Sequence, residues 1–136
     1  MLRVPTGDQR TLVFFDGTTV EFHFAGKQND WVEDELQMIP KSGTVPVQWT
    51  RLDDVQASVY LAKIWNKEHA IYAGWGVEFQ SNETDEFGQI VLKCRIRCSD
   101  NDGEVQQVGY HVVAVGILRV GVQAEKSTDY QKTADQ

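Results

Sequence analysis

The stretch AIYAGWGVEFQ, residues 70–80, decides the fold class because its apolar positions alternate with small or polar ones. One set of alternate positions is apolar and comprises Ile71, Ala73, Trp75, Val77 and Phe79. The other set comprises Tyr72, Gly74, Gly76, Glu78 and Gln80. Successive side chains of a β-strand point to opposite faces, so this pattern predicts a strand with one face in the core and one at the surface.

Residues 90–98, IVLKCRIRC, repeat this alternation and place Cys94 and Cys98 on the apolar face. In an extended strand these two cysteines lie about 13 Å apart, which is too far for a disulfide, so we expect two reduced thiols. Three histidines lack the spacing of zinc-ligand partners: His23, His69 and His111. The sequence therefore predicts no metal and no other cofactor.

Two hairpin turns are predicted. The dipeptide Asp16-Gly17 lies between β-rich runs and is typical of a two-residue turn, so we expect strands at 11–15 and 18–24. The core side of the second run is predicted to contain Val20, Phe22 and Phe24. Residues 66–69, NKEH, are expected to form the other turn, which would pair the strands at 51–65 and 71–80.

Residues 51–65 fit two secondary structures. Thr50 and Asp53 have the spacing of a helix capping box. As a strand, one face would be apolar apart from Lys63 and would contain Val55, Ala57, Val59, Leu61 and Trp65. The two-residue period favours the strand, and a helix here would change the class to α+β.

Several short strands without an alternating strand and helix pattern predict an all-β fold. We expect an antiparallel β-sandwich or barrel of about seven strands with one long loop at 25–44; the alternative is an α+β fold with a helix at about 51–65. Residues 1–122 are predicted to form a single β domain. The polar tail 123–136 has no hydrophobic period and is predicted to be mobile.

The charge balance argues against two classes of partner. The chain has 20 Asp and Glu against 13 Lys and Arg, a net charge of −7, which disfavours nucleic acid and anionic membranes. No stretch has the roughly 18 uninterrupted apolar residues of a membrane helix, and the start MLRVPTGDQR has no apolar run for a signal peptide. We expect a chain synthesised as a soluble protein, without membrane insertion.

Residues 112–118 are apolar at both sets of alternate positions. Val112, Ala114 and Leu118 form one face, and Val113, Val115 and Ile117 form the other. A strand that is apolar on both sides needs a second cover, from a helix, a loop or a neighbouring subunit. No nucleophile motif is present. We therefore expect a non-catalytic interaction or assembly module that forms a homo-oligomer or an accessory or structural subunit of a larger particle, with Val113, Val115 and Ile117 at the interface.

A second hypothesis is a lectin-like, carbohydrate-binding β-sandwich. Sugars bind on exposed aromatic rings beside carboxylates that accept hydrogen bonds. The candidate binding residues are three aromatic residues, two carboxylates and two glycines that would leave a strand face bare. They are Trp31, Tyr60, Tyr72, Glu33, Asp34, Gly74 and Gly76. The glycines have an alternative role, because they can also accommodate an aromatic ring from a neighbouring strand.

Overall fold

A computed structural model describes residues 2–27, 30–42, 45–67, 74–99 and 103–119, and this part of the chain is all β. Seven of its strands have four or more residues: β1 (Leu2–Pro5), β2 (Thr11–Thr18), β4 (Trp31–Met38), β7 (Trp49–Asn66), β8 (Gly74–Thr84), β9 (Ile90–Ser99) and β10 (Gly103–Leu118). Three have two residues: β3 (Phe24–Ala25), β5 (Lys41–Ser42) and β6 (Val45–Pro46). The all-β class is confirmed, and residues 51–65 are strand rather than helix. Among the described residues there is no helix that could span a membrane.

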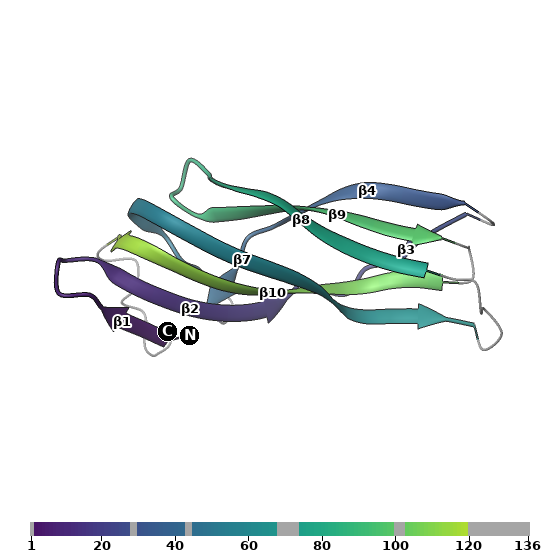
Figure 1. The fold of residues 1–136 in the computed structure, drawn as a ribbon, viewed down its shortest axis with the longest axis horizontal. Helices are drawn as coiled ribbons and strands as arrows, with labels where there is room; N and C mark the ends of the chain where they lie inside the picture. Colours follow the sequence, from purple (N-terminus) through teal and green to yellow (C-terminus); the bar gives the residue numbers. More distant parts are fainter. Residues whose placement is uncertain (1, 28–29, 43–44, 68–73, 100–102, 120–136) are drawn as a thin grey trace.

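The strands form two main antiparallel sheets (Figure 1). In the large sheet, β10 pairs along its whole length with β7 on one side, while β2 and β3 share its other side and β1 extends the sheet beyond β2. The small sheet has the order β4-β9-β8. A separate two-residue ladder joins β5 and β6.

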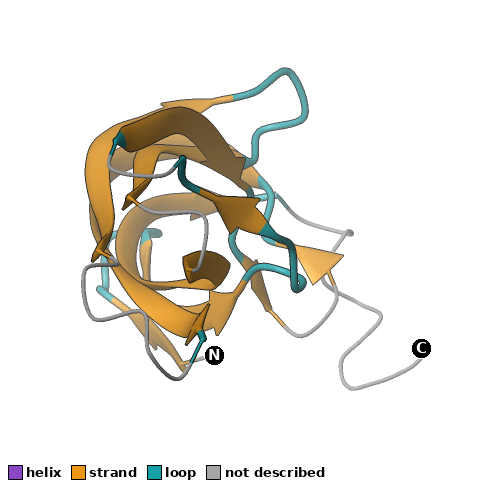
Figure 2. Cartoon of the chain, turned by 90° about the vertical axis from the view of Figure 1, so that its right-hand side faces the viewer, coloured by secondary structure: helices purple, strands orange, loops and turns teal. Residues whose placement is uncertain are grey.

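The core lies between the two sheets, and the strands surround a common interior when the molecule is seen end-on (Figure 2). From the small sheet, β9 contributes Ile90, Leu92, Cys94, Ile96 and Cys98, all buried as the alternation predicted. From the large sheet, the largest fully buried side chains are Val13, Val105, Val108 and Val112. The packing of one sheet on the other makes the fold a β-sandwich.

The predicted turn at Asp16-Gly17 is wrong. Both residues lie inside β2, opposite His111 and Tyr110 of β10. Pairing with β10 outweighs the local turn preference, and Gly17 is needed for another reason: a Cβ there would lie 2.6 Å from the Tyr110 hydroxyl. The chain instead turns before β2, between Thr6 and Arg10, where Gly7 and Gln9 have positive φ angles of 88° and 72°.

The segment after β2 is also less regular than predicted. Val20, expected in the core, has 84 % of its surface exposed because the regular ladder ends at Thr18. Phe22 and Phe24 pack against the core as expected. Their segment stays beside β10, since the amide of Phe22 donates a hydrogen bond to the Gln106 carbonyl.

The predicted loop at 25–44 contains a strand that the sequence analysis missed. β4 pairs with β9 over eight residues, from Trp31 opposite Ser99 to Met38 opposite Leu92. Its inward positions include Asp34, which is exposed. This charged residue interrupts the apolar alternation, so the sequence pattern does not predict the strand. As an edge strand, β4 tolerates this charge because the side chain reaches solvent.

The predicted hairpin between 51–65 and 71–80 is wrong as well. β7 belongs to the large sheet and β8 to the small sheet, where it pairs with β9. β7 pairs instead with β10, a partner that allows a ladder along the whole of β7. Tyr72 and the tail 123–136 lie outside the described residues.

Candidate functional site

The outward side of the large sheet carries an apolar surface. Two neighbouring rows cross β1, β2 and β10, because Phe14 pairs with Leu2 and Val113, and Leu12 pairs with Val4 and Val115. We call these six side chains the docking face: Leu2, Val4, Leu12, Phe14, Val113 and Val115. All are partly or well exposed, with Leu2 at 59 %, Val4 at 39 % and Phe14 at 37 %. Burying a surface of this kind would be favourable.

A polar row borders the docking face at one end. Asp16, His111 and Ser58 are cross-strand neighbours on β2, β10 and β7, and the His111 Nδ1 lies 3.5 Å from the Asp16 Oδ2. The Tyr60 ring stacks on His111 with 5.1 Å between the ring centroids. Tyr60 also lies over Gly109, where a Cβ would come within 2.2 Å of the tyrosine Cζ. The glycine therefore allows Tyr60 to lie against the sheet.

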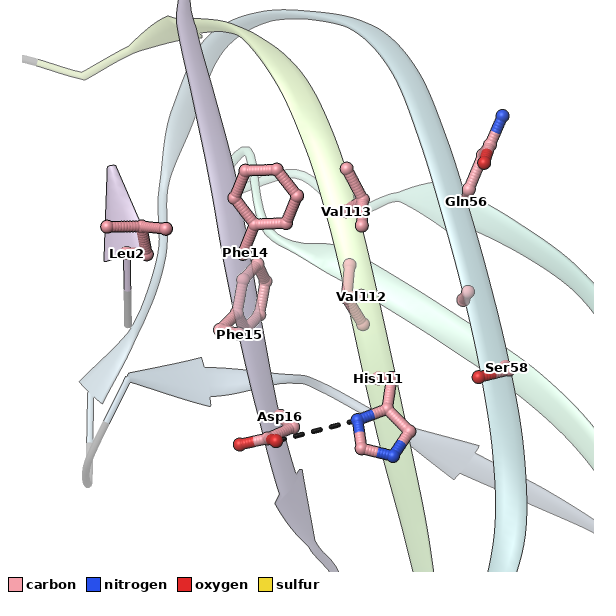
Figure 3. A pocket seen from close by; sticks show the side chains of 10 residues that line it. Leu2, Phe14, Phe15, Asp16, Gln56, Ser58, His111, Val112 and Val113 are labelled. Carbon is pink, nitrogen blue, oxygen red and sulfur yellow. Dashed lines mark ion pairs between the residues drawn. The ribbon is translucent and has the colours of Figure 1, made fainter. Parts of the chain in front are cut away.

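This row and the first apolar row line an open hollow of about 670 Å³ (Figure 3). Leu2, Phe14 and Val113 stand in one row, and the paired Asp16 and His111 stand in the next. Although serine, histidine and aspartate are the residue types of a hydrolase triad, the His111 and Asp16 side chains are 60 % and 69 % exposed. The row is therefore solvated, without the water-excluded setting in which such groups act most strongly.

A charged cluster borders the docking face at its other end. Arg10 contacts two carboxylates, with Nη2 2.8 Å from Asp8 and Nη1 3.6 Å from Asp53. Arg51 also pairs with Asp53, at 2.9 Å. The hydrogen bonds from Arg10 and from the Thr6 hydroxyl hold the pKa of Asp8 far below its ordinary value. Ile117, on the same side of β10 as Val113 and Val115, pairs with Arg51 and lies at this border.

The outward side of the small sheet is charged instead. Glu33 pairs across β4 and β9 with Arg97, whose Nε lies 2.8 Å from the glutamate Oε2, and Arg95 lies 3.6 Å from the other oxygen. Lys93 pairs with Glu83 at 3.1 Å. These alternating cross-strand ion pairs are well solvated and are typical of a face that remains in water.

Four of the predicted ligand-binding residues meet on this charged face. Trp31 and Gly74 flank Ser99, and Glu33 and Gly76 flank Arg97. The indole reaches across to Gly74, where a Cβ would lie 2.8 Å from Trp31 Cη2. Gly74 therefore accommodates an aromatic ring of this same chain, which is the alternative role considered for it. At Gly76 the nearest atom to an added Cβ is 4.0 Å away, so the space there is open.

The predicted ligand set does not form one site. Asp34 belongs to the inward set of β4, and its Oδ1 accepts a hydrogen bond from the amide of Glu35 at 2.7 Å. Tyr60 lies on the large sheet beside His111. Arg97 was not among the predicted residues, although its guanidinium lies 4.7 Å from the centroid of the Trp31 ring. The alternation of cationic residues in IVLKCRIRC could have indicated that Arg97 lies on the outward face of this strand.

Leu12 and Phe14 were not predicted to belong to a surface. They lie in residues 11–15, which the sequence analysis assigned to the first strand of the hairpin at Asp16-Gly17. LVFF, residues 12–15, is apolar at both sets of alternate positions, which is the signal that singled out residues 112–118. The two segments pair with each other, Phe14 opposite Val113. When two adjacent strands are each apolar on both faces, their outward side chains form one continuous apolar surface.

Cys94 and Cys98 are not joined by a disulfide, and both are buried in the core. Burial raises the pKa of Cys94 from 9.0 to about 11, so this thiol stays protonated near neutral pH. Cys98 donates a hydrogen bond to the carbonyl of Gly103 at 3.3 Å. In the described ranges there is no group of three or more His, Cys, Asp or Glu side chains placed to hold a metal ion.

The fold and its surfaces define an antiparallel β-sandwich with one apolar and one charged outer face. Comparison with protein-family models, with curated proteins and with solved structures found no match.

Proposed function

We propose that this chain is a non-catalytic assembly module that associates with copies of itself through the docking face. The observation that carries this proposal is the contrast between the two outer faces: six apolar side chains on the large sheet against ion pairs on the small one. Apolar burial stabilises an interface by about 25 cal/mol per Å² of surface removed from water. A module of this kind suits a structural or accessory subunit of a larger particle.

The order of the rows supports a second copy as the partner. The two apolar rows lie between the row of Asp16 and the cluster around Arg10. Two copies can stack face to face about a two-fold axis that lies in the interface, parallel to the two apolar rows and midway between them. Phe14 then lies over Leu12 of the other copy, and Val113 lies over Val115. The same rotation brings the Asp16 carboxylate over the Arg10 guanidinium of the second copy. Apolar rows then meet apolar rows, and opposite charges meet at the border.

Replacing Val113 with aspartate is expected to break this association. The substitution places an unpaired carboxylate in the centre of the docking face, at a cost of about 2 kcal/mol or more, which raises the dissociation constant at least tenfold. Size-exclusion chromatography with light scattering at two concentrations should give a multiple of 15.4 kDa for the native chain and a lower mass for Val113→Asp.

The matched control is Ser81→Asp, which adds the same charge to an exposed position of the small sheet. It should leave the mass unchanged, and circular dichroism should show all three proteins folded. A native chain that is monomeric at both concentrations, or a folded Val113→Asp variant of unchanged mass, would contradict the proposal.

A second candidate function is carbohydrate binding on the charged face. It is supported by Trp31, which is 47 % exposed and lies beside the open space at Gly76 and the ion pair of Glu33 with Arg97. An indole ring next to a carboxylate and a guanidinium offers the stacking and hydrogen bonding that a sugar requires.

Saturation-transfer NMR with a set of oligosaccharides at millimolar concentration tests this candidate. Trp31→Ala should abolish any signal, because it removes the stacking surface. Trp65→Ala is the matched control, since Trp65 is 43 % exposed on the other sheet, and it should keep the signal. The absence of signal from the native chain, or equal signals from both variants, rules the candidate out.

A further inference from the structure

β7 forms an edge of the large sheet. It pairs with β10 from Trp49 to Asn66, and no other described strand shares a ladder with its second side. β8 comes near it but belongs to the small sheet. The backbone amides and carbonyls on the second side of an edge strand are available to another strand.

The central part of β7 lacks the features that usually protect an edge. Natural edge strands are guarded by short length, proline, bulges or charges. β7 has 18 residues without proline or glycine, and its charges lie toward the ends, at Arg51, Asp53, Asp54 and Lys63. Residues 55–62, VQASVYLA, are uncharged. The ladder with β10 is regular from Val55 to Leu61, and its register shifts lie outside this stretch.

The other three edge strands of four or more residues carry such guards. β1 has only four residues and ends in Pro5. β4 carries three consecutive acids, Glu33, Asp34 and Glu35. The pairing of β8 shifts between Phe79 and Ser81, which disturbs the regularity that a partner strand would need. Among the described edges, the centre of β7 is therefore the best template for an added strand.

The inward side chains of β7 are incompletely covered. Val55, Ala57, Val59 and Leu61 pack against the core, but each remains partly exposed. Their counterparts on β10, by contrast, are buried between two neighbouring strands. A strand added beside β7 would cover these apolar side chains as well as form main-chain hydrogen bonds.

We propose that residues 55–61 of β7 pair with the same residues of a second copy, antiparallel, so that two large sheets join into one. This interface goes beyond the docking face and does not require it. A two-fold axis perpendicular to the joined sheet leaves both docking faces on the same side.

Charge and side-chain pairing select a second copy in one register. With Ser58 on the axis, Val55 lies opposite Leu61 of the second copy. Just outside the regular stretch, Asp53, which pairs with Arg51 of its own chain, comes opposite Lys63, which pairs with Glu21 of its own chain. Inward side chains of one copy must lie opposite inward side chains of the other. Because side chains alternate, the nearest registers that meet this condition move the axis by one residue, to Ala57 or to Val59. With the axis at Ala57, Arg51 would face Lys63, a repulsive pair; with the axis at Val59, Lys63 would face Val55. The Ser58 register alone of these three pairs opposite charges and apolar residues.

The variant Ser58→Cys tests this register directly. Paired residues on adjacent antiparallel strands have Cα atoms about 4.5–5.5 Å apart, which is within the range of a disulfide. With oxidised glutathione present, Ser58→Cys should become a disulfide-linked dimer on a non-reducing gel. The native chain should not, because Cys94 and Cys98 are fully buried.

Gln56→Cys is the matched control. Gln56 is exposed on the same face of β7, but in this register it lies opposite Tyr60, and the two cysteines would be about 13 Å apart. We expect at least tenfold less cross-linked dimer from Gln56→Cys than from Ser58→Cys. Equal cross-linking of the two variants, or none from Ser58→Cys, would overturn the proposal.

A double variant separates this interface from the docking face. When docking faces stack, Ser58 lies over Arg51 of the second copy, far from the other Ser58. Ser58→Cys combined with Val113→Asp should therefore still cross-link to the same extent as Ser58→Cys alone. Loss of cross-linking in the folded double variant would show that the docking face brings the chains together, and would refute the edge pairing.

Discussion

Replacing Leu92 with alanine should lower the free energy of unfolding by about 2–5 kcal/mol, because the substitution leaves a cavity in a closely packed interior. Leu92 lies on β9, the central strand of the small sheet, and none of its surface is exposed. It stands between Met38 of β4 and Asn82 of β8, and its side chain packs in the core between the two sheets. Urea unfolding followed by tryptophan fluorescence measures the change.

Val20→Ala is the control for this prediction. Val20 is also aliphatic, but 84 % of its surface is exposed, so its truncation should change the free energy of unfolding by less than about 0.5 kcal/mol. A loss at Leu92 no larger than the loss at Val20 would mean that the small sheet does not pack on the core as described.

The second large effect is expected at Gly116 of β10. A Cβ at this position would lie 2.2 Å from the carbonyl oxygen of Arg51 and 3.0 Å from the Cα of Leu52. Both atoms belong to the backbone of β7, so Gly116→Ala must push β7 away from β10. Overpacking of this kind costs about 1–3 kcal/mol and can cost more. Thermal and urea unfolding should both show the loss.

Gly109→Ala provides the comparison on the same strand. A Cβ there would also be too close to β7, at 2.2 Å, but the obstructing atom is the ring of Tyr60 rather than the backbone. Tyr60 is 39 % exposed and can rotate toward solvent. Gly109→Ala should therefore destabilise the protein less than Gly116→Ala, and the opposite order would contradict the close approach of β7 to β10 at Gly116.

Two-residue alternation was sufficient to predict the strands that have one buried face. β9 follows it from Leu92 to Cys98, and the alternation of β7 decided correctly between strand and helix. It failed for β4, since Asp34 occupies an inward position that only an edge strand tolerates. The turn at Asp16-Gly17 was wrong for a related reason: long-range pairing with β10 decides the conformation there, and the dipeptide contains no information about that pairing.

The candidate surfaces were predicted in part. Val113 and Val115 were selected because they form a second apolar face of one strand, and they do lie on the open side of the large sheet. Their neighbours Leu2 and Phe14 could not be selected with them, because a sequence does not reveal which strands are adjacent or in what register. Because strand adjacency was unknown, Tyr60 was also grouped with Trp31, and the structure places these two residues on different sheets.

The position of β10 at the centre of the large sheet sets the order in which the chain can fold during synthesis. β10 supplies the pairing partner of both β2 and β7, yet it occupies residues 103–118 and leaves the ribosome after them. β8 and β9 are nearer in sequence and can pair as soon as both emerge. β7, with its uncharged centre, must wait for β10 without a partner. Folding should therefore be slow for a chain of this length, and the newly made chain is most exposed to aggregation before β10 appears.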